Sequence, residues 1–151
     1  MAMRFITTFQ KLKRLRLHHV LKKKDSLQSF FQKQVIDLVF IHGSLAHDKL
    51  KPLSDVDVAI LFHKDYKYSQ LAKVNDKLSK FFEREDIDIA VLNRASPLLW
   101  MQVLQNGVLL YCRNEKFLKH FRLRTIQRYL ATKYLRRTFN YYMGKAILRS
   151  V

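Results

Sequence analysis

The sequence predicts an α+β domain with about four short strands and a larger number of helices. Short apolar runs rich in β-branched residues indicate strands, and two of them, 35–41 and 56–62, lie on either side of a polar turn. Longer segments with apolar residues at helical spacing lie before, between and after the strands. The chain has 151 residues, 48% of them hydrophobic, so it is long enough to bury the core of one domain.

The N-terminal region predicts two helices. From residue 3 to about residue 22, apolar residues recur at helical spacing with basic residues between them, which indicates an amphipathic helix. A second, short helix is expected through Lys33. Asp25 and Ser26 are predicted to cap it by offering side-chain oxygens to the exposed backbone N–H groups at its start.

The turn between the first two strands contains the residues that indicate a chemical role. It opens with Gly43 and Ser44 and closes at Asp55, directly before the second strand. Alternate side chains of a strand share a face, so Asp55 and Asp57 emerge on the same side. Two neighbouring carboxylates repel each other unless a cation lies between them, and hard oxygen ligands suit Mg²⁺. Gly43 allows close approach of a ligand to the backbone, and the Ser44 hydroxyl with consecutive N–H groups can bind phosphate oxygens.

The remaining core is predicted as helix, strand, helix and strand. A helix is expected over about 69–84, followed by a strand over 87–92. Ser96 and Pro97 are a typical helix start, and the helix is expected to end at Asn106-Gly107. A short fourth strand is predicted over 108–111.

The central residues resemble a known family signature. Gly43-Ser44, ten residues and then Asp55-Val56-Asp57 are similar to the G-S-x10-D-x-D pattern of the DNA polymerase β-like nucleotidyltransferases. The chain looks most similar to the minimal nucleotidyltransferases (MNT) that are paired with HEPN toxins, and the resemblance covers about 35–112. It implies a nucleotidyltransferase fold with a small mixed sheet, in which Gly43 and Ser44 hold the triphosphate while Asp55 and Asp57 bind the metal ion.

The family takes a third carboxylate from a later strand, and two residues have the parity to supply it. We assign this role to Asp88, because 88–93 and the residues that follow resemble the third-strand segment of the family. Asp86, at the start of the strand, is expected to be solvated. The family more often continues its turn as G-S-x-A-R-G, whereas this chain has His47 and Asp48 in place of Arg and Gly.

The resemblance implies an enzyme with Asp55, Asp57 and Asp88 as catalytic and metal-binding residues, Mg²⁺ as cofactor and ATP as substrate. The implied reaction transfers AMP to a hydroxyl, such as a tyrosine of a cognate HEPN toxin, which would make the chain an antitoxin. The expected organisation is a single nucleotidyltransferase domain over 1–151. The alternative is a non-catalytic basic module of the same fold that binds RNA or an acidic partner protein.

The net charge of +17 is concentrated in two flanks of the predicted catalytic core. Residues 1–34 have nine Lys or Arg and one acid, and 113–151 have eleven and one, whereas 35–112 have nine basic and ten acidic residues. Such an asymmetry predicts an anionic partner, either nucleic acid or an acidic protein surface. One or two basic helices are expected from Glu115 onward. Their apolar and tyrosine residues suit packing on the sheet, a partner subunit in a homo-oligomer, or RNA.

The single cysteine, Cys112, excludes an intramolecular disulfide and is consistent with a cytoplasmic protein. No apolar stretch approaches the roughly 20 residues that a membrane-spanning helix needs, so no membrane association is expected.

Overall fold

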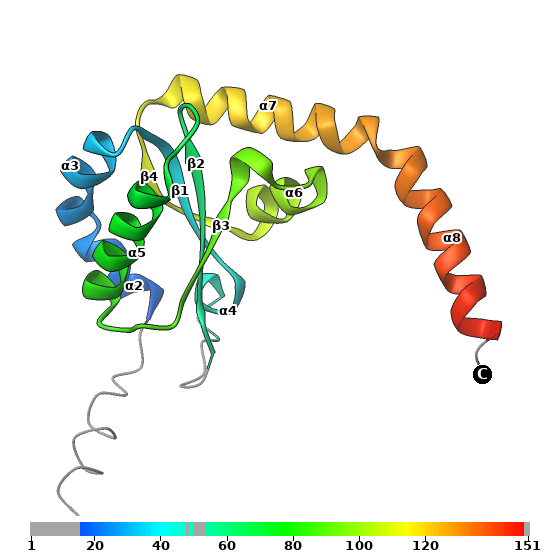
Figure 1. The fold of residues 1–151 in the computed structure, drawn as a ribbon, viewed down its shortest axis with the longest axis horizontal. Helices are drawn as coiled ribbons and strands as arrows, with labels where there is room; N and C mark the ends of the chain where they lie inside the picture. The colour runs from blue at the N-terminus through cyan, green and yellow to red at the C-terminus, as the bar shows by residue number, and fades with distance from the viewer. Residues whose placement is uncertain (1–15, 48, 50–53, 150–151) are drawn as a thin grey trace, which may run out of the picture.

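A four-stranded mixed sheet forms the centre of the computed structural model, which describes residues 16–47, 49 and 54–149 and the side chains of these up to residue 145 (Figure 1). The strand order is β3-β2-β1-β4. Strand β1 (Ile36–His42) is antiparallel to both of its neighbours, β2 (Val56–Phe62) and β4 (Val108–Cys112), and β2 is parallel to β3 (Ile87–Val91). The predicted α+β class and the four strands of a mixed sheet are confirmed.

Helices cover both faces of the sheet (Figure 1). Side chains of α2 (Leu17–Lys23), α3 (Asp25–Lys33) and α5 (Tyr68–Phe82) pack on one face. Those of α6 (Pro97–Asn106) and α7 (Glu115–Ala131) pack on the other. The remaining helices are the four-residue α4 (Gly43–Ala46), the 3₁₀ turn η1 (Leu92–Arg94) and α8 (Lys133–Arg149).

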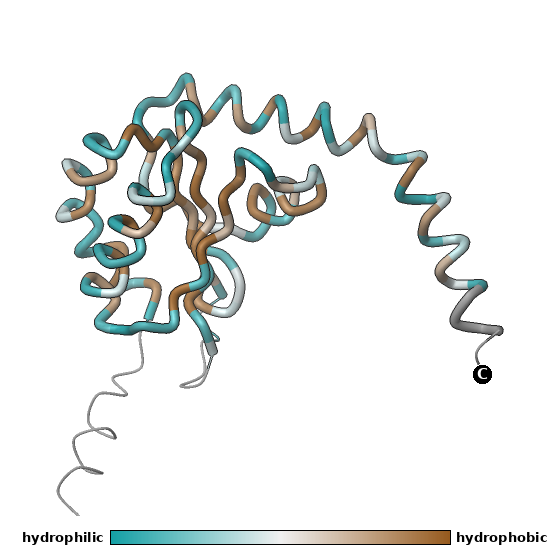
Figure 2. The backbone as a smooth tube through the Cα atoms, viewed as in Figure 1, coloured by the Kyte–Doolittle hydropathy of each residue, from teal (hydrophilic) through white to brown (hydrophobic). Residues whose placement is uncertain are grey.

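The alternation predicted for the second strand is confirmed by its packing. Val56, Val58, Ile60 and Phe62 join the core under α3 and α5, while Ala59 and Leu61 join the core under α6 and α7. Figure 2 shows the strands as a hydrophobic centre between helices of mixed character. Because side chains alternate along a strand, Asp57 must lie on the α6 and α7 side of the sheet.

The N-terminal prediction holds only in part. Helix α2 lies in the segment expected to be helical, and residues 3–15 of that prediction lie outside the described residues. The predicted cap by Asp25 and Ser26 is wrong. Lys24 is the residue before α3 and has helical angles, Asp25 is already in the helix, and the Ser26 hydroxyl donates to the Lys23 carbonyl at 2.8 Å. A capping side chain needs an extended residue at the helix start, and the single-residue junction between α2 and α3 does not supply one.

The beginning of β1 is tied to its neighbouring strands by a buried carboxylate. Asp37 is 5% exposed, and its Oδ2 lies 3.1 Å from His63 Nδ1, just beyond β2. Its Oδ1 lies 3.4 Å from Arg113 Nε, just beyond β4, and the Arg113 N–H donates to the Asp37 carbonyl at 2.8 Å. These contacts fix the end of the sheet that is opposite to Gly43.

The C-terminal region forms two helices, as expected, and only the first packs closely on the domain. Phe121 of α7 is 2% exposed and lies between Phe40 and Trp100, with ring centroids 5.4 and 5.0 Å away. Helix α8 begins after Thr132 and extends away from the sheet (Figure 1). Within the described parts of the chain, no helix is long and apolar enough to cross a membrane.

Candidate active site

Three polar side chains form a row across the sheet at the end that adjoins α4. In the strand register Asp57 lies opposite His42 of β1 on one side and opposite Asp88 of β3 on the other. All three are on the same face, because residues directly opposite in a register point to the same side of a sheet. Asp88 is exposed and Asp57 is half-buried, so the row is open to solvent from the β3 edge. The exposed Asp55 lies two residues before Asp57.

Gly43 is required where β1 turns into α4. Its φ is +66°, a left-handed conformation that side chains disfavour. A Cβ on this residue would lie 2.1 Å from Asp57 Oδ2, so the carboxylate rests directly against the glycine backbone. The predicted Gly43-Ser44 turn is therefore a short helix, anchored by the fully buried Leu45 and with Ser44 half-buried in it.

The ionisation of Asp57 is opposed by its surroundings. Burial raises the pKa of Asp57 above its ordinary value, and the neighbouring Asp88 and Asp55 carboxylates raise it further, while His42 acts in the opposite direction. Both acidic residues are thus close enough to act on Asp57 electrostatically. Three like charges gathered in this way make a favourable place for a cation.

His42 belongs to this row, although no sequence motif pointed to it. Burial lowers the pKa of His42 and outweighs the opposing influence of Asp57 and Asp88. Its Nε2 is buried and has no hydrogen-bond partner among the residues that the structure describes. Its position directly before Gly43 was a weak signal, since only the pairing of β1 with β2 places it opposite Asp57.

Asp86 has a different role from Asp88. Arg84 Nε donates to Asp86 Oδ1 at 2.7 Å, and the same guanidinium donates to the Ser54 carbonyl at 2.8 Å. The hydrogen bond from Arg84 lowers the pKa of Asp86. Asp86, expected to be solvated, is therefore held in an ion pair, and Asp88 is the acid of this strand that faces Asp57.

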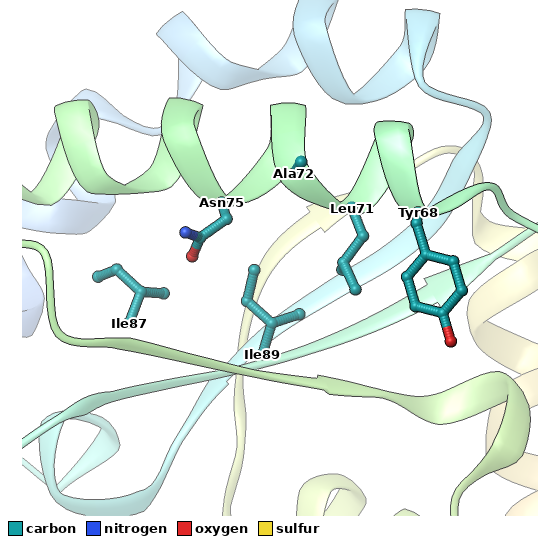
Figure 3. Close-up of a pocket in the computed structure, with 6 residues that line it drawn as sticks. All are labelled: Tyr68, Leu71, Ala72, Asn75, Ile87 and Ile89. Atoms are coloured by element: carbon teal, nitrogen blue, oxygen red, sulfur yellow. The ribbon is translucent and has the colours of Figure 1, made fainter.

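An apolar pocket of about 450 Å³ lies between α5 and β3, away from the acidic row (Figure 3). Figure 3 shows Leu71 and Asn75 of α5 above Ile87 and Ile89 of β3, with Tyr68 at one end. Asp88 lies between the two isoleucines in the sequence, so its side chain points to the opposite face of the sheet. Among the described residues none with a charge lines the pocket, and it is separate from the candidate active site.

A family model described as "Polymerase beta, Nucleotidyltransferase" matches residues 25–116, which is more than half of the chain. The chain belongs to this nucleotidyltransferase family. The match includes Gly43, Ser44, Asp55, Asp57 and Asp88, and therefore every residue predicted for the site. None of the curated proteins compared with the chain matches it.

Solved structures share the nucleotidyltransferase fold. They include a chain of a toxin–antitoxin complex with AMP-PNP (20% identity, 80% of this chain and 98% of that chain, TM-score 0.68). Another is a chain from the structure of the tri-AMPylated HEPN toxin of Shewanella oneidensis in complex with MNT antitoxin (19% identity, 83% of this chain and 98% of that chain, TM-score 0.65). A third is assigned as a minimal nucleotidyltransferase (20% identity, 64% and 97%, TM-score 0.56). At sequence identities of 19–20%, the similarity shows only that these chains share their fold with this one.

The donor set of this nucleotidyltransferase fits Mg²⁺, although the protein alone does not enclose the ion. Within the described residues, no group of three or more His, Cys, Asp or Glu side chains is arranged to hold a metal ion. Mg²⁺ usually keeps several waters and binds through one or two carboxylates together with substrate phosphates. Asp57, which lies against Gly43, and the exposed Asp55 have carboxylates of the kind that such a site would use. Asp88 remains a predicted third ligand.

Proposed function

We propose that this nucleotidyltransferase transfers AMP from ATP to a protein hydroxyl, with Mg²⁺ as cofactor. We further propose that the acceptor is a tyrosine of a HEPN-type toxin and that the chain acts as its antitoxin. The main support is the row of His42, Asp57 and Asp88. In this row Asp57 lies against the backbone of Gly43 and has a second carboxylate, Asp88, opposite it on the neighbouring strand. The names of the solved relatives, which mention AMP-PNP and a tri-AMPylated HEPN toxin, support the choice of nucleotide and acceptor.

Each predicted site residue has a definite part in this proposal. Asp55 and Asp57 would hold Mg²⁺, which when bound offsets the negative charge of the phosphates and makes the acceptor hydroxyl more acidic. Backbone N–H groups at the start of α4 and the Ser44 hydroxyl would bind phosphate oxygens. The carboxylate of Asp88 would accept the proton of the acceptor hydroxyl. The acceptor oxygen then bonds to the α-phosphorus as the bond to the bridging oxygen breaks, and pyrophosphate leaves.

The geometry around Asp57 explains why positioning of the reacting groups would supply most of the rate acceleration. Gly43 leaves room for Asp57 Oδ2 because it has no Cβ, and the strand register fixes Asp57 between His42 and Asp88. Pairing with a strand on each side fixes the backbone of Asp57, so its carboxylate starts close to the position that the reaction needs. The exposed Asp88 at the β3 edge is accessible to a large acceptor such as a protein.

The test is transfer of labelled AMP. The purified chain is incubated with Mg²⁺, α-³²P-labelled ATP and the product of the neighbouring gene, and label on that protein and released pyrophosphate are measured. The Asp57→Asn variant should lower transfer by at least about 100-fold, the loss expected when a main electrostatic group is removed. The matched control is Asp65→Asn, which removes an exposed carboxylate from a loop outside the row. Equal labelling by wild type and Asp57→Asn would refute the proposed catalytic role.

A further inference from the structure

The C-terminal arm, defined as residues 116–149 of α7 and α8, has an unbalanced positive charge. The sequence of this arm contains ten Lys or Arg and no Asp or Glu. The ion pair recorded for it among the described residues joins Lys119 to Glu115, just outside the arm, at 3.8 Å. Helix α8 projects from the body of the protein, so its cations also lie far from the acidic row (Figure 1). An isolated positive surface of this kind attracts a polyanion.

One side of α8 combines cations with exposed aromatic rings. Tyr134, Arg137, Tyr141 and Lys145 follow one another at intervals of three or four residues, which places them on the same side of a helix. Tyr134 is 78% exposed and Tyr141 is 58% exposed. Lys145 Nζ lies 4.4 Å from the centroid of the Tyr141 ring, so a cation and a ring are already paired on this surface.

The two tyrosines are spaced along a rigid element. They are seven residues apart, which is close to two helical turns or about 10 Å. Tyr134 offers an exposed ring on which a base can stack. Tyr141 contacts Lys145 and, in a T-shaped arrangement at 5.5 Å between ring centroids, Tyr142, and it remains 58% exposed for a second base. The cations between and beyond the rings can neutralise phosphates. The exposed residues Leu135, Phe139 and Met143 lie on other sides of the helix and do not belong to this surface.

We propose that the α8 surface formed by Tyr134, Arg137, Tyr141 and Lys145 binds single-stranded RNA. Unstacked bases fit the exposed rings, because base–aromatic stacking needs a free ring face and tolerates any base sequence. Double-stranded RNA buries its bases and its major groove is too narrow for side chains to read, so it would use only the cations. An acidic protein surface would also match the cations, and competition by polyglutamate in the experiment below distinguishes it from RNA. This binding activity is separate from nucleotidyl transfer.

The experiment measures binding of the full-length protein to a fluorescein-labelled 20-nucleotide oligouridylate by fluorescence anisotropy between 50 and 300 mM salt. The double variant Tyr134→Ala/Tyr141→Ala should weaken binding by roughly tenfold for each tyrosine, whereas Tyr134→Phe/Tyr141→Phe should bind as the wild type does. The variant Arg137→Gln/Lys145→Gln should lower the slope of log K against log salt by about 1.4. Circular dichroism checks that each variant keeps its helices.

A matched control removes the same charge from another face. Lys73→Gln/Lys80→Gln changes two exposed lysines of α5 and should leave both RNA affinity and the salt slope unchanged. Asp57→Asn should bind RNA like the wild type, so loss of catalysis and loss of RNA binding are independent results. The proposal is overturned if the alanine and phenylalanine pairs bind equally, or if the α5 control weakens binding as much as the α8 charge variant. It is also overturned if polyglutamate competes as well as unlabelled oligouridylate, since the surface would then recognise charge alone.

Discussion

Replacement of Gly43 by alanine tests the geometry on which the candidate active site depends. The added methyl group would lie 2.1 Å from Asp57 Oδ2 and 2.8 Å from its Cγ, both shorter than van der Waals contact. The φ of +66° at Gly43 is also unfavourable for any residue with a Cβ. Gly43→Ala therefore imposes backbone strain at residue 43 and a steric clash between the added methyl group and Asp57.

The two effects should separate in measurement. A left-handed conformation is about 1–2 kcal/mol less favourable for alanine, so the free energy of unfolding should fall by about that amount. The clash itself adds little to this loss, because the Asp57 carboxylate is the free end of a side chain and can rotate away. That rotation moves the predicted metal ligand by about 1 Å or more, a displacement that can lower a catalysed rate by roughly 100-fold. Urea unfolding measures the first effect and transfer of labelled AMP per folded molecule measures the second.

Gly144 is the matched control for this substitution. It lies within α8, and a Cβ at this position would meet no atom within 4 Å. Gly144→Ala should therefore raise the free energy of unfolding, by about 0.5–1 kcal/mol if α8 melts with the domain, and leave transfer unchanged. If Gly43→Ala unfolds at the wild-type urea concentration and transfers AMP at the wild-type rate, Asp57 does not act from its place beside Gly43.

Three further substitutions concern acids with different surroundings. The pKa of Asp57 is raised in the folded protein, so its ionisation opposes folding. Asp57→Asn should therefore become more stable than the wild type as pH rises above 3.8, which urea unfolding in metal-free buffer measures. Because Arg84 lowers the pKa of Asp86, Asp86→Asn should lose up to about 1 kcal/mol of stability at pH 7, and the loss should disappear as pH falls below 3.8. Asp37→Asn should lower the free energy of unfolding by about 1.5 kcal/mol, because Arg113 loses its anionic partner and the hydrogen bond with His63 is weakened, while transfer per folded molecule stays unchanged.

The strands were predictable because their pattern is local. Side chains from Val56 to Phe62 alternate between two cores, and a period of two residues is visible in the sequence without any knowledge of the neighbouring strands. The helix ends were less predictable. Helix α5 was expected to reach Arg84 but ends at Phe82, because Glu83 adopts a left-handed conformation with φ +55°. Nothing in a glutamate residue indicates that conformation in advance, since glycine and asparagine are the usual residues there.

The candidate site was predictable only where its members are close in sequence. The spacing from Gly43 to Asp55 and Asp57 could be read directly. Asp86 and Asp88 have the same parity, so the ion pair with Arg84 was needed to show from the structure that Asp86 is already engaged. His42 required the register of β1 with β2, a contact between residues that are 15 positions apart. No local pattern in the sequence encodes that pairing.

The buried Asp37 and the half-buried Asp57, at opposite ends of the sheet, show where an external cation is needed. Asp37 lies beside Arg113 and His63, so the chain itself supplies a cationic partner and a hydrogen-bonding partner. Asp57 instead has two carboxylates and a histidine whose charged form is disfavoured by burial. A carboxylate in those surroundings lowers the stability of the folded protein unless a cation binds beside it. The position of Asp57 is therefore better explained by binding of a cation together with phosphate than by the stability of the fold.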